Sequence, residues 1–196
     1  MEIRFEKLSV NNVKLTKGFS CETDTSSLKS KDKRRVKRRD KELSDFLEKE
    51  ALQEQEKIFS TTHLLIGDND ELVGFVSLCN DSLNLATDSQ NKYGTVYCSV
   101  PAMKIARLGV SSKYQHKGYG KYLLQYALFK AIDVLGFSGV AFITLDCYEH
   151  RKTFYLKNGF ELTDTQPQKR TYDTPISMCR HIISWLSEIS STNDNV

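Results

Sequence analysis

Apolar positions recur along the chain with two spacings, and each spacing predicts one kind of element. Alternating or continuously apolar runs predict strands at residues 1–8, 62–66, 71–78, 103–110, 140–145, 160–163 and 176–181. Apolar residues at helical spacing predict helices over residues 33–59, 118–135 and 150–158, the last one ended by Gly159. This order of elements favours an α+β domain in which a few helices wrap a mixed sheet.

The two longer helices each require a face that packs against the sheet. We expect the first to bury Leu43, Phe46, Leu47, Ala51 and Ile58. We expect the second to bury a broad face made of Tyr122, Leu123, Tyr126, Ala127, Phe129, Lys130 and Val134.

Three segments carry little apolar pattern. Residues 9–32 are rich in Ser, Thr and Lys and are expected to be flexible, residues 80–93 read as a polar loop, and SWLSEISSTNDNV reads as a fraying tail. We therefore expect a strand and a flexible basic segment in residues 1–42, the folded domain in residues 43–183, and a tail in residues 184–196.

Composition places the chain among soluble globular proteins, with 196 residues of which 39% are apolar and 27% charged. The formal net charge is only +3, but residues 29–42 hold nine Lys or Arg against three acidic residues. The N-terminal residues form no apolar leader and no apolar run is long enough to span a bilayer, so we expect a cytoplasmic protein without a membrane partner.

The five cysteines form no C-x-x-C pair, and their odd number fits reduced thiols better than a disulfide framework. Cys147 and His150 have the spacing of half a metal site. Since no second half accompanies them, we expect no metal.

The stretch QHKGYG, residues 115–120, joins a predicted strand to a helix that has no Ser, Thr, Asp or Asn as its cap. A glycine-rich turn at a helix N-terminus directs several N–H groups and the helix dipole at one point, which suits a phosphate. The two common phosphate motifs do not match, because Tyr122 replaces the Ser or Thr of a Walker A loop and Leu123 replaces the third glycine of G-x-G-x-x-G.

The pattern Q-x-x-G-x-G after ARLGV, together with FYLKNGFEL one strand later, resembles the GNAT family of acetyl-CoA-dependent N-acetyltransferases over residues 43–181. The resemblance implies a central mixed, mostly antiparallel twisted sheet of six to seven strands flanked by about four helices. It also implies acetyl-CoA as the cofactor. The residues that it assigns to this cofactor are Leu108, Gly109, Val110, Gln115, His116, Lys117, Gly118, Tyr119, Gly120, Lys121 and Phe154.

Two roles follow from that resemblance. A backbone N–H near Val110 would stabilise the oxyanion that forms at the thioester carbonyl. Tyr155, in the F-Y-x-x-x-G-F motif, would act as the general acid that protonates the departing thiolate. No residue stands out as a base; Asp146 and Glu149 follow a strand and are weaker candidates for contact with the substrate.

Within the family, LSDFLEKEALQEQEK, THLLIG, DELVGFVSL, KIARLGV and FYLKNGF are most similar to the toxin-like branch that acetylates the α-amine of aminoacyl-tRNA. That branch implies tRNA and an antitoxin protein as candidate partners, besides the amine substrate and a second copy of the chain. Arg34, Arg35, Arg38 and Arg39 are the candidate contacts to tRNA. Two alternatives stay open: a housekeeping N-acetyltransferase of a small or protein amine, and a non-catalytic module that binds acetyl-CoA.

Overall fold

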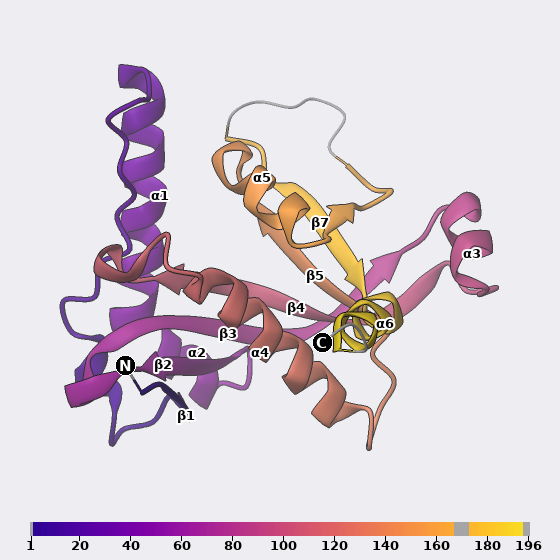
Figure 1. Cartoon of the computed structure of the whole chain (residues 1–196), viewed down its shortest axis with the longest axis horizontal. Coiled ribbons are helices and arrows are strands. Elements are labelled where there is room, and N and C mark those ends of the chain that lie inside the picture. The colour runs from indigo at the N-terminus through magenta and orange to yellow at the C-terminus, as the bar shows by residue number, and fades with distance from the viewer. Residues whose placement is uncertain (1, 167–172, 194–196) are drawn as a thin grey trace. The chain divides into compact units, whose positions relative to one another are not determined.

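The computed structural model describes residues 2–166 and 173–193. The strands are β1 (Arg4–Lys7), β2 (Thr61–Ile66), β3 (Leu72–Asn84), β4 (Ser99–Val110), β5 (Phe142–Cys147), β6 (Glu161–Leu162) and β7 (Ile176–His181) (Figure 1). The α-helices are α1 (Ser30–Lys49), α2 (Ala51–Glu56), α3 (Thr87–Tyr93), α4 (Tyr119–Val134), α5 (Glu149–Lys157) and α6 (Ile182–Asn193). Short 3₁₀ helices form at Val13–Thr16, Asp68–Asp70 and Ser112–Tyr114.

The strands form one sheet in the order β1-β2-β3-β4-β5-β7-β6, in which β4 and β5 are parallel. The α+β class is therefore confirmed, and the sheet has seven strands, the upper limit of the six to seven expected. The described residues form six α-helices instead of about four, because parts of the expected polar loop and tail are helical. None of the helices in the described segments has the length and apolar character needed to span a bilayer.

Two compact units make up the chain. Unit 1 contains Met1–Cys79 and Ala106–Tyr126, and unit 2 contains Asn80–Ile105 and Ala127–Val196. The elements β3, β4 and α4 each contribute residues to both units.

Unit 1 has a core between α1, α2 and the strands. Its buried members are Leu8, Phe19, Cys21, Phe46, Leu47, Ala51, Leu64, Ile66, Leu72 and Phe75. The predicted hairpin of β2 and β3 is confirmed, with antiparallel pairs such as Leu64 with Phe75.

The single helix predicted over residues 33–59 is wrong in its limits. α1 begins at Ser30 and ends at Lys49, and α2 follows as a separate helix. No Gly or Pro marks the break; instead the Gln55 side chain donates to the Leu8 carbonyl at 2.5 Å and accepts from the Thr62 N–H at 3.1 Å, which holds α2 against the start of β2. Ile58, expected in the core, is 91% exposed.

The segment between β1 and α1 was expected to lack regular structure. It contains the 3₁₀ helix Val13–Thr16, and it buries Phe19 and Cys21 to 8% and 3% exposure in the core of unit 1. Val13 and Leu15 of the same segment pack against this core as well, so scattered apolar side chains anchor a segment that is otherwise mostly polar. The domain limits at residues 42 and 183 stay predictions; α1 spans the first of them.

Unit 2 is built on β5, which pairs in parallel with β4 and antiparallel with β7 (Figure 1). The continuously apolar run predicted for this strand is confirmed, since Phe142, Ile143 and Leu145 are at most 2% exposed. α5 ends as predicted, with Gly159 at a φ of 76° after the C-cap Asn158.

Two predictions for unit 2 are wrong. Residues 80–93 are not a loop, because β3 continues to Asn84 and α3 follows; the Asp164 carboxylate accepts from the Ala86 N–H at 2.7 Å and caps that helix. The expected C-terminal tail begins as α6, whose Trp185 is 5% exposed and packs against Phe160 with ring centroids 6.0 Å apart. Residues 194–196 of the predicted tail lie outside the described residues.

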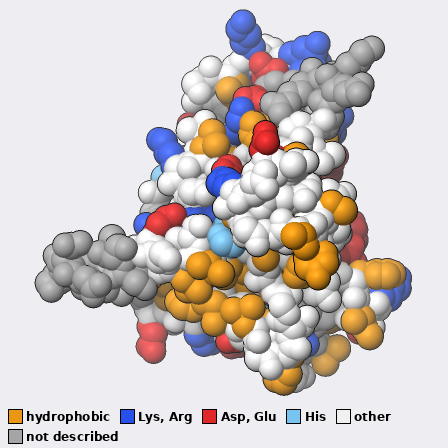
Figure 2. Space-filling view, turned by 90° about the vertical axis from the view of Figure 1, so that its right-hand side faces the viewer, with side chains coloured by type: hydrophobic (Ala, Val, Ile, Leu, Met, Phe, Trp, Pro, Cys, Tyr) orange, Lys and Arg blue, Asp and Glu red, His pale blue; other side chains and the backbone are white. Residues whose placement is uncertain are grey.

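The buried face of α4 differs from the predicted one. Leu123, Leu124, Ala127, Leu128 and Ala131 have no exposed surface. Tyr122 and Phe129 are 39% and 58% exposed, and hydrophobic side chains are visible on the surface in the space-filling view (Figure 2). An aliphatic stripe fills the core, and the aromatic residues beside it stay partly outside.

Candidate active site

The turn before α4 lies in unit 1 and presents backbone donors. His116 and Gly118 have φ angles of 61° and 89°, in the left-handed region, just before Tyr119 begins the helix. Within the described residues, the N–H groups of residues 116–121 donate to no backbone or side-chain acceptor. Six adjacent donors at the start of a 16-residue helix form a site for an anionic group.

Gly118 leaves this site open. A Cβ added to Gly118 would meet no atom within 4 Å, so the protein itself does not fill the space beside this residue. The positive φ angle also disfavours any other residue type. The turn therefore fits the pyrophosphate of acetyl-CoA, as the resemblance implied.

The side chains of the turn mostly contact the protein. The Lys117 ammonium donates to the Lys113 carbonyl at 2.9 Å and lies 5.3 Å from the Tyr114 ring centre. Tyr119 packs edge-on against Tyr114 at 5.8 Å. His116, Lys121 and Gly118 are exposed or partly exposed, and Gly120 lies in the first turn of α4.

Gln115 makes the most extensive contacts of the turn. Its side-chain amide lies 2.9 Å from the Cys21 carbonyl, 3.2 Å from the Val110 carbonyl and 3.3 Å from the Glu22 carbonyl. The side chain is therefore directed at protein carbonyls. Only the backbone N–H of Gln115 can belong to the predicted pyrophosphate site.

The end of β4 has an open edge. The pairing between β4 and β5 ends at Ile105 and Leu145, although β4 continues to Val110. The Ser111 N–H donates to the Val73 carbonyl on the β3 side at 2.9 Å, so by strand alternation the N–H groups of Leu108 and Val110 face the other side. This is the orientation expected for a strand edge that receives the pantetheine arm and the thioester carbonyl.

Gly109 has a packing reason as well. A Cβ there would lie 2.7 Å from a ring carbon of Phe75, which has no exposed surface. The glycine thus permits β3 and β4 to approach closely.

The predicted acid, Tyr155, lies on α5 in unit 2. It is 9% exposed and packs against Phe154 and Phe160, with ring centroids 5.0 and 5.8 Å away. Burial raises the pKa of Tyr155 well above its usual range, interaction with Cys147 raises it further, and the charge of Arg151 opposes the rise. The phenol is therefore protonated at neutral pH, which is the form that an acid requires.

Asp146 belongs to a polar cluster on one face of unit 2. Its carboxylate accepts from the Lys104 ammonium and from the Ser177 hydroxyl, both at 2.6 Å. Burial raises the pKa of Asp146, but the hydrogen bonds from Lys104 and Ser177 outweigh it and leave the pKa below its usual value. A carboxylate held in this way is a poor general base. Glu149 is the first residue of α5.

No feature of the sequence marks Lys104 and Ser177 as partners of Asp146. Lys104 stands in an apolar strand and Ser177 lies beyond a polar segment. Only the strand register, which pairs Asp146 with Ser177, brings these residues together.

The four predicted arginines lie on α1 in unit 1. Arg35 pairs with Asp32 at 3.6 Å, and Arg38 and Arg39 pair with Glu42 at 3.7 and 2.9 Å. Arg34 is exposed on the same helix. α1 holds nine basic and five acidic residues, so the helix keeps a positive excess.

The thiols do not add a second site. All five cysteines lie within the described residues, and none of them forms a disulfide bond. Burial and the neighbouring carboxylates Asp146 and Glu149 raise the pKa of Cys147 to about 12, which keeps it protonated. The described residues contain no cluster of three or more His, Cys, Asp or Glu that could hold a metal ion.

Comparison with known proteins gives matches of three kinds. The family model described as an acetyltransferase (GNAT) domain matches residues 60–162. A tRNA-acetylating toxin of Mycobacterium tuberculosis is 27% identical over 126 residues, which cover 64% of this chain and 75% of that protein.

Among solved structures, a crystal structure of a KacT mutant aligns with a TM-score of 0.71 and 15% identity, covering 95% of this chain and 99% of the other. AtaT complexed with acetyl-methionyl-tRNAfMet aligns with a TM-score of 0.68 and 15% identity, covering 90% and 94%. At these identities the structures establish the fold. With the family model matching more than half of the chain, over β2, the turn before α4 and α5, the chain belongs to the acetyltransferase (GNAT) family.

Proposed function

We propose that this protein is an acetyl-CoA-dependent N-acetyltransferase that acetylates the α-amine of aminoacyl-tRNA, and that it acts as a cytoplasmic toxin. The observation that carries the first part is the row of unpaired N–H groups at residues 116–121, ahead of α4. Acetyl-CoA supplies an activated acetyl group as a thioester, and its pyrophosphate has the charge and size for this row of donors.

Two parts of the chain act on the reacting atoms: the open edge of β4, through Val110, and the helix α5, through Tyr155. The backbone N–H of Val110 stabilises the negative charge that develops on the thioester oxygen when the amine attacks. Tyr155 donates its proton to the departing sulfur. Because burial makes the Tyr155 phenolate costly, the phenol recovers a proton from the acetylated nitrogen, which must lose one in the same step.

The nature of the amine follows from the absence of a clear base. A lysine side chain, with a pKa of about 10.4, is almost wholly protonated at neutral pH, whereas an α-amine near 7.7–8.0 has an appreciable neutral fraction. Asp146, one of the two carboxylates considered, accepts hydrogen bonds from Lys104 and Ser177. An enzyme without a base is suited to an α-amine.

The basic helix α1 supports tRNA as the carrier of that amine. Residues 29–42 hold nine basic and three acidic residues, and they begin at the N-cap of α1, Lys29, and extend beyond its middle. Positive charge at a helix N-terminus opposes the helix dipole, so this arrangement costs stability in the free protein. A polyanion bound along α1 would remove that cost.

The similar proteins agree with this reading. One relative is a tRNA-acetylating toxin, AtaT has been solved with acetyl-methionyl-tRNAfMet, and AtaT with its antitoxin AtaR has been solved with acetyl-CoA. We extend these properties to the present chain, and with them an antitoxin protein as its natural partner.

The test compares the wild type with Tyr155→Phe in a controlled expression assay. We expect wild-type expression to arrest growth and to leave acetylated aminoacyl-tRNA detectable by mass spectrometry. The variant loses one hydroxyl with little volume, so we expect its turnover to fall by about 10²- to 10⁴-fold at unchanged acetyl-CoA affinity. Turnover near the wild-type value would remove Tyr155 as the acid.

A second arm tests the substrate. Neutralising Arg34, Arg35, Arg38 and Arg39 together should weaken activity on charged tRNA and flatten its dependence on salt concentration. An unchanged salt slope would separate α1 from tRNA binding. Acetylation of small or protein amines without acetylation of charged tRNA would favour the housekeeping enzyme, and acetyl-CoA binding without any transfer would favour the binding module.

A further inference from the structure

The segment Ser20–Thr23, called the strap below, is bonded on one side to α1. The Cys21 N–H donates to the Ser44 hydroxyl at 3.3 Å, and the Thr23 N–H donates to the Asp40 carboxylate at 2.8 Å. Asp40 and Cys21 are both 3% exposed, so these bonds are sheltered from water. The strap therefore has a fixed position against the helix.

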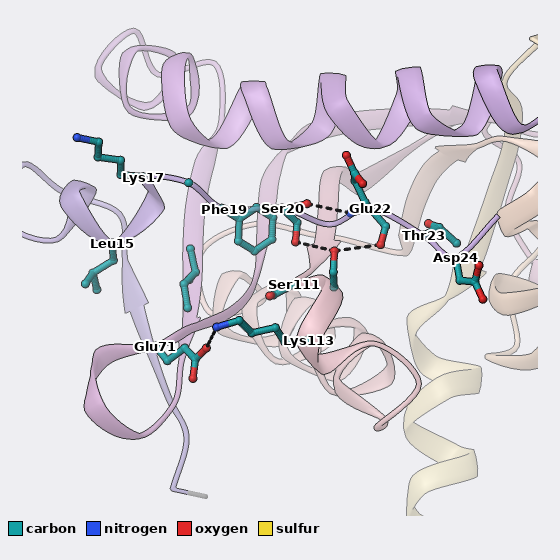
Figure 3. Close-up of a pocket in the computed structure, with 13 residues that line it drawn as sticks. Leu15, Lys17, Phe19, Ser20, Glu22, Thr23, Asp24, Glu71, Ser111 and Lys113 are labelled. Atoms are coloured by element: carbon teal, nitrogen blue, oxygen red, sulfur yellow. Dashed lines mark hydrogen bonds and ion pairs between the residues drawn. The ribbon is translucent and has the colours of Figure 1, made fainter. Parts of the chain in front are cut away.

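The other side of the strap is bonded to the residues between β4 and α4. The Ser112 N–H and hydroxyl donate to the Ser20 carbonyl at 2.9 and 3.1 Å, and the hydroxyl also lies 3.0 Å from the Glu22 carbonyl (Figure 3). The Gln115 amide donates to the carbonyls of Cys21 and Glu22. In Figure 3 the strap runs between the helix and the turn that carries Ser111 and Lys113, along a pocket of about 560 Å³.

The turn before α4 needs such support. Its own N–H groups at residues 116–121 bond to nothing within the described residues, and two of its residues have positive φ angles. The Tyr122 N–H donates to the Gly118 carbonyl at 3.2 Å, so backbone hydrogen bonds fix the turn only at its helix end. The other bonds that reach it come from the Gln115 side chain, at its first residue, and from Lys117, whose partner Lys113 belongs to the same turn.

We propose that the strap is a structural part of the cofactor site, and that Gln115 is a positioning residue which holds the pyrophosphate turn in shape by tying it to the strap, at the carbonyls of Cys21 and Glu22, and to the end of β4, at the carbonyl of Val110. The proposal rests on the proposed function. It makes residues 20–23, some 90 positions before the turn, necessary for acetyl-CoA affinity although none of their side chains is assigned to the cofactor.

The main test is Gln115→Met in the full chain, because methionine has nearly the same length and donates no hydrogen bond. Loss of these bonds should raise the acetyl-CoA Kd by calorimetry, and the KM for acetyl-CoA, by about tenfold. The kcat at saturating acetyl-CoA and the KM for the acceptor should stay at wild-type values. A residue with a general stabilising role would instead change all of these values together.

Ser112→Ala provides a second variant, since it removes only the hydroxyl bonds to the strap and is expected to raise Kd about threefold. If thermal melting shows that Gln115→Met does not fold, the Kd of Ser112→Ala decides the test. Asp40→Asn keeps an acceptor for the Thr23 N–H and should keep the wild-type Kd. Lys17→Ala, at an exposed position three residues before the strap, is the matched control and should change nothing.

The outcomes separate this inference from the proposed function. Wild-type Kd and KM in both Gln115→Met and Ser112→Ala, with normal melting, would overturn the role of the strap while leaving the acetyltransferase intact. A wild-type protein that binds no acetyl-CoA would overturn the proposed function and this inference with it.

Discussion

Gly159 is the position where a single methyl group should test the packing at the end of α5. It follows α5 at a φ of 76°, and an added Cβ would lie 2.7 Å from Cζ of Arg180 and 2.9 Å from Nε and Nη2. The guanidinium is not free to move away. It donates to the Asn158 carbonyl and to Glu188, both at 2.5 Å, and lies 4.1 Å from the ring centre of Trp185.

The cost of Gly159→Ala has two parts. The left-handed conformation costs a non-glycine residue about 1–2 kcal/mol. Displacing the guanidinium sacrifices a hydrogen bond made by a charged group, worth about 1.5–3 kcal/mol. We therefore expect the free energy of unfolding to fall by about 2.5–5 kcal/mol, a large share of the about 5–15 kcal/mol typical of a folded protein.

Gly94 offers a matched control, because it ends α3 at a φ of 66° and an added Cβ would meet nothing within 4 Å. Gly94→Ala should show only the conformational cost of about 1–2 kcal/mol. Urea unfolding of both variants measures the difference. Equal losses would refute the argument that Arg180 is fixed, and with it the view that this cluster holds the end of α5.

Three further predictions concern the site itself. Gly118→Asp should abolish acetyl-CoA binding by calorimetry while the far-UV circular dichroism spectrum stays native, because it places a side chain and a negative charge in the predicted pyrophosphate site; unchanged affinity would remove the pyrophosphate assignment. The kcat/KM for the acceptor should rise with pH as the α-amine deprotonates near about 7.7–8.0. Because burial raises the pKa of Tyr155, kcat/KM should show no decline below about pH 10. A descending limb near pH 9 would mean that the phenol ionises early. Asp146→Asn should keep the ascending limb of that profile, since Asp146 is not the base, whereas loss of the limb would identify it as one.

The strands and the motif turn were predictable from sequence because their signals are local. A continuous apolar run marked β5, and the glycines of residues 115–120 marked the turn before α4. The break between α1 and α2 was not predictable, because it depends on Gln55, a polar residue whose partners Leu8 and Thr62 are brought together only by the pairing of β1 with β2.

In the candidate site, too, some residues have a local sequence signal and others depend on how the strands pair. Tyr155 and Gly118 could be named from short motifs, whereas the engagement of Asp146 by Lys104 and Ser177 depends on the register of three strands. The strap was invisible for a related reason: it contributes carbonyl groups, which every residue type possesses, so its side chains carry no signal of the role.

The unpaired N–H groups ahead of α4 also have a consequence for the lifetime of the protein. Acetyl-CoA bound there would act as the missing helix cap, and because Leu123 and Leu124 carry α4 directly into the core, that cap would stabilise the folded state as a whole. By mass action, ligand at 100 times its Kd adds about 2.7 kcal/mol to the free energy of unfolding. Susceptibility to cellular proteases would then rise as acetyl-CoA runs low, and the amount of active enzyme would follow the carbon supply of the cell.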